Sequence, residues 1–351
     1  MPATTLGQEL ERQTREGELY ERYNGNWTRC FACGHRCPIP DGAAGVCKVR
    51  FNRGGRLMVP WGYVSGAACD PIEKKPFFHA YPGSLAFSFG MLGCDLHCGY
   101  CQNWVTSQAL RDPAALLIAR DASPEALVSE AVRRGARAVV STYNEPLITA
   151  EWAVEIFRLA RRAGLVTGFV SNGNGTPEVI DYLRPWVDLY KIDLKGFDDK
   201  RYRQLGGRLD PVLDTIGRVH AAGLWVEIVT LLVPGFNDGD DELRQLAAFV
   251  AGVSPDIPWH VTAYHEDYRM AGTGNTTVAM LERAARIGRE AGLRYVYAGN
   301  IPGAVGDLEN TCCPACGHLL VERSGFRVRR NQVTSDGGCP SCGASIPGRW
   351  A

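Results

Sequence analysis

The sequence lacks a net charge, a long apolar run and an apolar leader. Its 38 Lys and Arg residues balance 38 Asp and Glu residues over 351 positions, so the overall field does not favour DNA, RNA or an anionic membrane as the main partner. No apolar stretch approaches the roughly 20 residues of a membrane-spanning helix, and no basic segment followed by an apolar core opens the chain. We expect a soluble, cytoplasmic protein that recognises its partners locally.

Cysteine, in contrast, is plentiful and clustered. The chain has thirteen cysteines, an odd number, and most fall in close groups. Without an export signal this clustering favours metal binding over disulfide bonds. The length suits one barrel-sized domain with small appendages. We therefore predict an N-terminal arm and Cys-rich module over 1–80, a β/α domain over 81–305 and a C-terminal knuckle module over 306–351.

Three cysteines, Cys94, Cys98 and Cys101, directly follow the apolar run at 85–92. Thiolates packed this closely in one loop suit an iron–sulfur cluster. A cubane cluster has four irons and the loop supplies three ligands, so the fourth iron would be open to a small chelating molecule. Two simpler interpretations are a partial zinc site completed by His97 and thiols that only fill the core.

A second group lies among turn-forming prolines and glycines near the N-terminus, and it consists of Cys30, Cys33, Cys37 and Cys47. This pattern indicates a loop wrapped around a metal. The metal is either zinc, with His35 as a possible replacement for one thiolate, or a second iron–sulfur cluster. The spacing alone does not separate the two.

A third group consists of two CxxCG knuckles, formed by Cys313, Cys316, Cys339 and Cys342, with a predicted hairpin between them. Paired knuckles that flank strands predict a four-thiolate site, with structural zinc as the first choice. A rubredoxin-like iron site uses the same ligands. Cys69 and Cys312 fall outside these patterns.

The middle of the chain alternates apolar runs with amphipathic stretches. One helix is predicted to begin at Ser123–Pro124, with a stripe made of Leu127, Val128, Ala131 and Val132. Repeated strand, helix, glycine and strand indicates parallel βα units, hence an α/β fold with a partial or full parallel (β/α) barrel. Residues 1–29 are predicted to be a helix-prone packing arm. The predicted buried strands lie at about 85–92, 137–143, 165–172, 187–194, 224–233, 258–264 and 293–298.

Polar residues follow most of these strands. In a β/α barrel the loops at the carboxyl ends of the strands build the site. Each segment has an ordinary explanation, such as a helix start, a turn or an ion pair, but together they predict a site at one rim that includes the cluster loop. The residues concerned are Asn144, Glu145, Ser171, Asn172, Asp193, Lys195, Tyr264, His265 and Asp267.

The Cys94-x3-Cys98-x2-Cys101 motif, with the aromatic Tyr100 before its third cysteine, resembles the signature of radical S-adenosylmethionine (SAM) enzymes, and the resemblance extends over about 80–305. It implies a barrel of the radical SAM type and a [4Fe-4S] cluster whose open iron binds SAM. It also implies an external low-potential electron donor, whose electron splits the sulfonium to methionine and a 5′-deoxyadenosyl radical.

The same resemblance assigns the cofactor-binding residues. Tyr100 and Asn144 belong to matching segments, and Glu145 corresponds to a Glu-Pro motif that contacts the methionine amino group, although the usual paired glycines are missing. Ser171 and Asn172 would face the ribose or carboxylate. Asp193 and Lys195 stand where activases of the pyruvate formate-lyase type carry an Asp-x-Lys.

Further segments resemble narrower groups. The stretch 229–242 resembles the Val-Pro-Gly region of those activases, although the two flanking cysteine modules are not part of a minimal activase. The segments at 35–40, 70–76, 101–104 and 259–270 together resemble AmmeMemoRadiSam system radical SAM proteins. That resemblance implies AMMECR1-like or Memo-like proteins as partners and does not fix the reaction.

The leading hypothesis is a radical SAM enzyme of the oxidoreductase or activase type that abstracts hydrogen from a substrate, with a protein as first choice. His265, Tyr264 and Asp267 are the candidates for substrate chemistry. One alternative is a small-molecule substrate with an auxiliary cluster for electron transfer or sulfur donation. An alternative of another class is a zinc-ribbon module that binds nucleic acid or protein, although the neutral charge and the lack of a basic, aromatic stripe make nucleic acid an unfavourable ligand.

Overall fold

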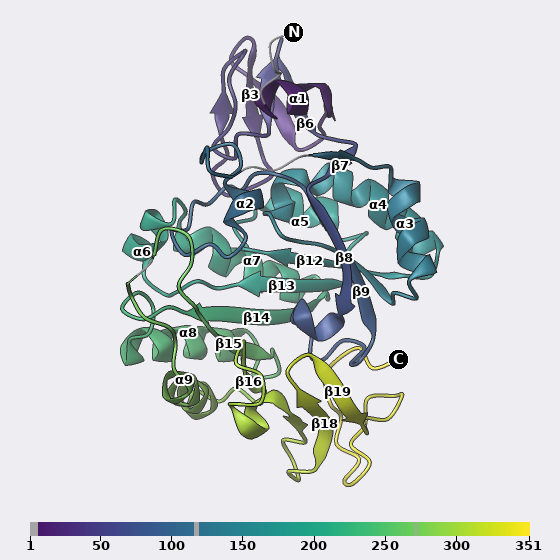
Figure 1. Cartoon of the computed structure of the whole chain (residues 1–351), viewed down its shortest axis with the longest axis vertical. Coiled ribbons are helices and arrows are strands. Elements are labelled where there is room, and N and C mark those ends of the chain that lie inside the picture. Colours follow the sequence, from purple (N-terminus) through teal and green to yellow (C-terminus); the bar gives the residue numbers. More distant parts are fainter. Residues whose placement is uncertain (1–5, 116–118, 271) are drawn as a thin grey trace.

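The computed structural model describes residues 6–115, 119–270 and 272–351. Three regions follow one another along the longest axis of the molecule (Figure 1). An N-terminal module lies at one end, an α/β region with the main sheet lies in the middle, and a small β module near the C-terminus lies at the other end. None of the described helices is long and apolar enough to cross a membrane.

The N-terminal module is built mainly of short strands. Asn24 and Gly25, with φ of 44° and 70°, turn the chain between β2 and β3, so the prediction of a helix-prone arm over 1–29 is right only for α1 and wrong for the strands. The signal that it overlooked is the Asn-Gly pair, which favours a hairpin. The elements are α1 (Leu6–Arg12), β1 (Thr14–Glu16), β2 (Tyr20–Tyr23), β3 (Trp27–Cys30), β4 (Pro38–Ile39), β5 (Phe51–Arg53) and β6 (Arg56–Pro60).

The central sheet has eight strands in the order β16-β15-β14-β13-β12-β11-β9-β8. All neighbours pair in parallel except β8, which is antiparallel to β9. Every buried strand predicted from the sequence is present. Within the described residues β16 and β8 remain the two edges, so the barrel is partial and does not close. The strands are β8 (Gly66–Pro71), β9 (Leu85–Gly90), β11 (Ala138–Ser141), β12 (Val166–Ser171), β13 (Leu189–Asp193), β14 (Trp225–Leu232), β15 (Trp259–Ala263) and β16 (Val296–Gly299).

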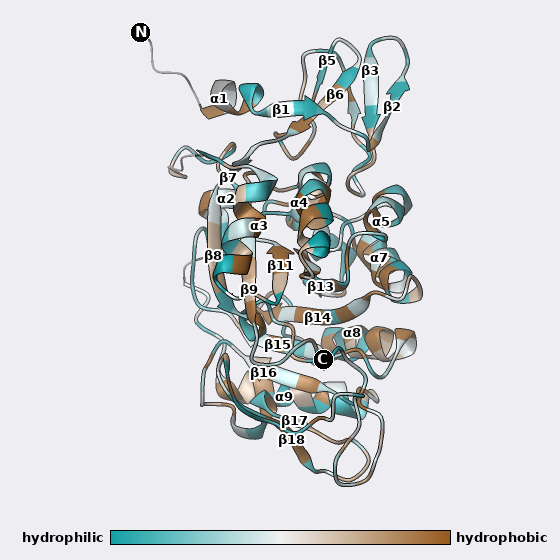
Figure 2. Cartoon of the chain, turned by 90° about the vertical axis from the view of Figure 1, so that its right-hand side faces the viewer, coloured by the Kyte–Doolittle hydropathy of each residue, from teal (hydrophilic) through white to brown (hydrophobic). Residues whose placement is uncertain are grey.

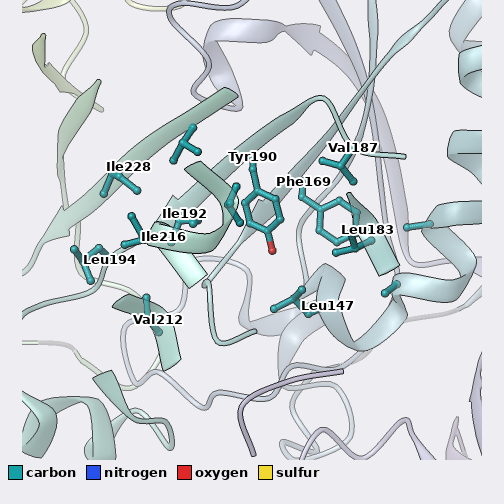
Figure 3. Close-up of a cluster of buried hydrophobic side chains, with 14 of the residues drawn as sticks. Leu147, Phe169, Leu183, Val187, Tyr190, Ile192, Leu194, Val212, Ile216 and Ile228 are labelled. Atoms are coloured by element: carbon teal, nitrogen blue, oxygen red, sulfur yellow. The ribbon is translucent and has the colours of Figure 1, made fainter. Parts of the chain in front are cut away.

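Helices connect the parallel strands and share one continuous core with them. Phe169, Tyr190 and Ile228 point from the strands toward side chains such as Leu183 and Ile216 of α5 and α7 (Figure 3). Figure 2 shows that strands in the middle of the sheet are largely hydrophobic. The connecting helices are α3 (Pro124–Arg133), α4 (Ala150–Arg162), α5 (Pro177–Leu183), α6 (Asp199–Gln204), α7 (Leu209–Ala221), α8 (Asp240–Val253) and α9 (Val278–Glu290).

Helix α3 starts as predicted, because Ser123 Oγ accepts a hydrogen bond from Ala126 N at 3.1 Å. The predicted apolar stripe of this helix is buried except for Val132, which is 52% exposed because it lies beyond the edge of the buried face. Glycine follows four helices in the left-handed conformation that ends a helix, as expected. These glycines are Gly135, Gly164, Gly223 and Gly292, with φ between 67° and 97°.

The face of the sheet opposite the helices is partly filled by the segment 72–80. Ile72, Phe77 and Ala80 pack on it against small strand residues such as Ala138. Glu227 of β14 holds the end of this segment, because its carboxylate accepts the backbone N–H groups of Phe78 and His79, both at 2.9 Å. This segment lies within the predicted N-terminal domain but packs on the main sheet.

The C-terminal module is a three-stranded sheet of β17 (Thr311–Cys312), β18 (Leu319–Ser324) and β19 (Arg327–Asn331). The hairpin predicted between the knuckles is confirmed. The buried Arg323 joins the module to the sheet by donating to Phe78 O at 2.7 Å. The turn of the hairpin carries Phe326, which is 38% exposed. Short elements elsewhere are β7 (Tyr63–Val64), α2 (Trp104–Ser107) and β10 (Arg120–Asp121).

Candidate active site

A cavity of about 420 Å³ lies on the inner face of the sheet. It extends from the cluster loop, at Cys98 and Cys101, to Phe326 of the C-terminal hairpin. The segment 73–78 supplies another part of its wall. Strands β12 to β15 contribute through alternate residues, because side chains alternate between the faces of a strand. These strand residues are Val170, Lys191, Asp193, Val229, Leu231, His260 and Thr262.

The cluster loop follows β9 and surrounds a smaller cavity of about 100 Å³, which all three of its cysteines line. Cys98 is buried, and Cys94 and Cys101 are partly buried. Two polar groups contact the thiols: Leu96 N–H donates to Cys94 Sγ at 3.4 Å, and Ser107 Oγ lies within hydrogen-bond distance of Cys101 Sγ, at 3.2 Å. Three thiols that converge on one small cavity fit a cluster with one open coordination position.

Burial raises the pKa of the Cys98 thiol to about 12, although the nearby Lys195 opposes the shift. A thiolate at this place therefore needs a positively charged centre beside it. A single zinc ion shared with His97 finds no support. Among the described residues, no compact group of three ligand atoms, all within 4.8 Å of one another, includes these cysteines or His97.

Glu145 lies next to the cysteines and is buried, with 3% exposure. Its carboxylate accepts hydrogen bonds from Ser171 Oγ (2.7 Å), Asn172 N (2.7 Å) and Leu147 N (3.0 Å). Burial, and then the charge of Asp95, raise the pKa of Glu145 to about 8. No salt bridge to Glu145 forms within the described residues. A buried carboxylate without a cationic partner fits a ligand that brings an ammonium group.

Asp95 connects the cluster loop to the end of β12. It is fully buried, and its two carboxylate oxygens accept from Asn172 Nδ2 at 2.7 Å and Asn174 Nδ2 at 2.8 Å. These bonds hold Ser171 and Asn172 beside the thiols. The structure thus brings together three strand ends that the sequence placed at one rim.

Asp193 and Lys195 line both cavities. Asp193 pairs with Lys191 at 2.6 Å and lies 3.8 Å from Lys195. Burial opposes its charge, but the two lysines keep the pKa of Asp193 below its usual value. The site therefore holds a largely buried group with two cations and one anion, and Lys191 was not among the predicted site residues.

Tyr100 lies in the wall of the larger cavity and is 3% exposed. Its ring packs edge-on against Phe236 and Tyr264. Its hydroxyl has no hydrogen-bond partner within the described residues. Because a buried hydroxyl without a partner is costly, this atom fits contact with a bound ligand.

The three candidates for substrate chemistry lie outside the cavity lining. Tyr264 is buried, and its hydroxyl donates to Met270 O. His265 is exposed. Asp267 accepts from Tyr268 N at 2.7 Å and so shapes the loop. A role for them in substrate chemistry stays a prediction, and their present contacts are structural.

The cavity contains polar residues that the sequence reasoning missed. His260 lines it and is held by Glu227, with His260 Nε2 2.7 Å from Glu227 Oε2. Lys75 lines it and pairs with Asp70 at 2.9 Å. Strand alternation could have found His260, since Trp259 and Val261 belong to the helix-facing core and the residue between them must face inward. Lys75 has no such signal, because its segment is irregular.

The C-terminal cysteines form the compact four-thiol group that the knuckles predicted. The ligand atoms of Cys313, Cys316, Cys339 and Cys342 all lie within 4.8 Å of one another. Two of the Sγ–Sγ distances are 3.6 and 3.8 Å. A tetrahedral zinc–thiolate site, with bonds of about 2.3 Å, has edges of about 3.8 Å. The group could bind one metal ion, and it lines neither of the two cavities at the cluster loop.

The cysteines of the N-terminal module lie on the other side of the cluster loop. Cys30, Cys33 and Cys47 are buried and Cys37 is partly buried. His35 Nε2 lies 3.1 Å from Asp95 O, which places this module directly against the loop. None of the four thiols lines either of the two cavities.

Comparison with known proteins agrees with a cluster site at the three loop cysteines. Residues 90–249 match the model of the radical SAM superfamily. An uncharacterized protein of Methanocaldococcus jannaschii is 37% identical over 335 residues, which cover 95% of this chain and 98% of that protein. The chain belongs to the radical SAM superfamily. Membership implies a [4Fe-4S] cluster and SAM. The three thiols, the Glu145 carboxylate, which has no salt bridge among the described residues, and the Tyr100 hydroxyl, which has no hydrogen-bond partner among them, fit these groups.

More distant relatives share the radical SAM region. Pyruvate formate-lyase 1-activating enzyme of Escherichia coli is 24% identical over 238 residues, which cover 62% of this chain and 93% of that enzyme. Among solved structures, a radical SAM methyltransferase from Sphaerobacter thermophilus is 18% identical, with 68% of this chain and 71% of that chain covered and a TM-score of 0.47.

Proposed function

We propose that this radical SAM protein uses the thiols of the cluster loop and the residues around Glu145 to cleave SAM and abstract hydrogen from a substrate in the 420 Å³ cavity. The observation that carries the proposal is the continuity of that cavity, which begins at Cys98 and Cys101 and ends at the hairpin turn. When bound, the cluster supplies the electron that splits the sulfonium to methionine and a 5′-deoxyadenosyl radical.

The residues of the chain divide the remaining work. Glu145 would receive the ammonium group of SAM. Ser171 and Asn172 keep the Glu145 carboxylate in place. Lys191 and Lys195 hold Asp193 ionised in the wall. The Tyr100 ring and its unpaired hydroxyl would contact the nucleoside half. The aliphatic side chains Val229 and Leu231 line the same cavity and exclude water from the reaction.

Anaerobic reconstitution with iron and sulfide tests this function. The protein should gain the absorbance of an iron–sulfur cluster and, with dithionite and SAM, release 5′-deoxyadenosine. A cluster-loaded sample that forms no 5′-deoxyadenosine would contradict the proposal. Salt-sensitive binding of tRNA or DNA by the same sample would instead favour the zinc-ribbon alternative.

A protein is our first choice of substrate, with AMMECR1-like or Memo-like proteins as the proposed partners. Phe326 supports this choice, because a partly exposed aromatic residue at the cavity wall offers an anchor for a polypeptide. The test is incubation of each partner, in deuterated form, with enzyme, reductant and unlabelled SAM. Deuterium from a labelled partner should appear in 5′-deoxyadenosine, and its absence with both partners would remove them as substrates.

A small-molecule substrate is the second candidate, favoured by the charged groups at the cavity wall. Lys75, Lys191 and His260 are all buried and line it. They suit a small ligand with anionic groups. Transfer of deuterium from a labelled small anionic metabolite, but from no protein, would support this candidate.

A further inference from the structure

The four cysteines of the N-terminal module form one group. The Cys33 thiol interacts electrostatically with Cys30, Cys37 and Cys47. Tight turns bring them together, because Cys30 N donates to Cys37 O and Arg36 N donates to Cys33 O, each at 3.0 Å. A Cβ atom at Gly45 would lie 3.5 Å from Cys37 Sγ, so the loop before Cys47 also closes on the group.

The thiols of this group are spaced differently from those of the C-terminal knuckles. Throughout the described ranges, only the knuckle thiols have all ligand atoms within 4.8 Å of one another. No three of the N-terminal thiols come this close in the structure, whereas a single tetrahedral ion has thiolate edges of about 3.8 Å. The thiols of the cluster loop share this wider spacing. In a polynuclear cluster each thiolate binds a different iron, which requires such a spacing.

A buried guanidinium beside the group has one donor without a partner. Arg50 is 1% exposed and forms a double ion pair with Glu151, at 2.7 and 2.8 Å. Its Nε has no hydrogen-bond partner within the described residues, and its charge interacts with Cys30 and Cys47. A cationic N–H without a partner among the described residues, close to Cys30 and Cys47, fits an anionic cluster, since hydrogen bonds to the sulfurs tune such clusters.

We propose that Cys30, Cys33, Cys37 and Cys47 bind a polynuclear iron–sulfur cluster, rather than zinc, and that this second cluster passes electrons to the cluster held by Cys94, Cys98 and Cys101. Four thiolates leave no iron open for a substrate. The group also lines neither of the two cavities at the cluster loop. Electron transfer is the chemistry that remains for a closed cluster in this position.

A short path joins the two sites. Gly34 N donates to Asn174 O at 2.8 Å, and Asn174 Nδ2 donates to Asp95 Oδ2 at 2.8 Å. Asp95 is bonded directly to Cys94, and His35 contacts its carbonyl oxygen. Gly34 has no room for a Cβ atom, which would overlap Asn174 Oδ1 and lie 2.9 Å from Pro211. The close approach of Cys33 to the cluster loop is thus built into the packing.

The electron transfer needs one external reactant, an electron donor. An external low-potential one-electron donor reduces the N-terminal cluster by one electron and is itself oxidised. The N-terminal cluster then reduces the cluster at the loop by one electron and returns to its oxidised state. The relay role depends on the proposed function, whereas the presence of the second cluster does not.

The test uses the full chain with Cys94→Ala, Cys98→Ala and Cys101→Ala combined. After anaerobic reconstitution this variant should retain about two to four irons per chain, with acid-labile sulfide and the electron paramagnetic resonance signal of a reduced cluster. Adding Cys30→Ala and Cys33→Ala should remove this iron and leave the zinc content unchanged. Cys312→Ala, outside all three groups, is the matched control. Two zinc ions and no iron in the first variant would overturn the proposal.

Mössbauer spectra of the wild-type protein keep the test valid if the variants fail to fold. SAM should alter only part of the iron signal, because only the cluster at the loop has an open iron. A single cluster that responds fully to SAM would contradict a second cluster. If two clusters are present but no 5′-deoxyadenosine forms, the proposed function fails and this assignment stands.

The relay role has its own measurement. In Cys30→Ala/Cys33→Ala, reduction of the loop cluster by a reduced flavodoxin-type protein should slow by more than about tenfold, because a bulky donor would need the second cluster to reach it. The small reductant dithionite should still reduce the loop cluster directly. Equal rates with the protein donor in variant and wild type would refute the relay.

Discussion

The C-terminal knuckles and the cluster loop use the same ligand, a cysteine thiol, in different surroundings. In the knuckles four thiols converge, with two Sγ–Sγ distances of 3.6 and 3.8 Å, on the small β module near the chain end. In the loop three more widely spaced thiols surround a cavity of about 100 Å³ that opens toward strand-borne charges. The first arrangement leaves a metal no free position, and the second leaves one.

With the proposed function, this difference separates a structural centre from a reactive one. A four-thiolate ion contributes binding energy to a small module that has little core of its own. A three-thiolate cluster needs further groups to hold its ligand, and Glu145, Ser171 and Asn172 converge there through hydrogen bonds. The surroundings of the thiols, rather than their number in the chain, indicate the function.

Loss of one loop thiol should have the largest effect. Cys98→Ala should reduce 5′-deoxyadenosine formation to background, a loss of at least about 1,000-fold, because two thiolates do not hold the cluster in place. Iron content should fall while zinc content stays constant. Cys69→Ala, a lone and partly buried thiol on β8, is the control and should behave like wild type. If Cys98→Ala still cleaved SAM, the loop thiols would not form the reactive centre.

The pH dependence of SAM binding tests whether Glu145 needs a bound ammonium group to ionise. Its raised pKa of about 8 means that the cofactor-free protein holds a proton there at pH 7. An arriving ammonium group favours the ionised form, so SAM binding should release about one proton, and affinity should rise about tenfold from pH 6 to pH 7. Glu145→Gln should weaken SAM binding about 10- to 100-fold and abolish the proton release. Calorimetry in buffers of different ionisation enthalpy measures both effects.

The same carboxyl group affects stability without SAM. Because the folded-state pKa of Glu145 lies above the ordinary value of 4.5, the folded protein binds its proton more tightly than the unfolded chain. Stability should therefore fall as the pH rises from about 4.5 to about 8, and Glu145→Gln should flatten this slope. An unchanged slope in the variant would assign the effect to another group.

The sequence predicted the strands well, because they follow from local patterns. Of the strand-end residues, Glu145, Asn172, Asp193 and Lys195 line the cavity at the cluster loop, whereas Tyr264, His265 and Asp267 do not, and the roles of all of them stay predictions. Each buried strand is an apolar run, and the residue after a parallel strand must lie at the carboxyl rim. The helix-prone arm was wrong, since pairing of β2 with β3 overrides weak helix propensity. The segment 72–80 was not placed, because it has no periodicity and is held by contacts distant in the sequence, such as those of Glu227 and Arg323.

The inward-facing residues were missed for a different reason. Lys191 and His260 lie inside strands, whereas the predicted site residues were chosen only at strand ends. A charged residue inside an apolar run, such as Lys191 between Tyr190 and Ile192, is a usable signal, since burial of a lysine requires a partner. That partner is Asp193, two residues later on the same face of the strand. The sequence contains the pair, but only the fold shows that it faces a cavity.

Removing the knuckle metal should affect stability more than chemistry. Cys316→Ala/Cys342→Ala should lose about one bound metal ion per chain and lower the thermal unfolding temperature, because a four-thiolate site couples metal binding to folding. Cleavage of SAM without substrate should change by no more than about threefold, since the knuckle thiols line neither of the two cavities at the cluster loop. Iron content is the control. A loss of cleavage comparable to that of Cys98→Ala would make the knuckles part of the reactive centre.

Phe326 gives the smallest expected effect and the sharpest test of how the two regions meet. It belongs to the C-terminal hairpin but lines the cavity that starts at the cluster loop. Phe326→Ala should leave SAM cleavage without substrate within about twofold of wild type, while the affinity for a protein partner should fall about fivefold through loss of an exposed aromatic anchor. Phe326→Leu should keep most of the affinity, because it retains apolar area. Titration measures partner binding by the wild type and the two variants. Equal affinities would show that the hairpin does not recognise the substrate, and would favour a small molecule held by Lys75, Lys191 and His260.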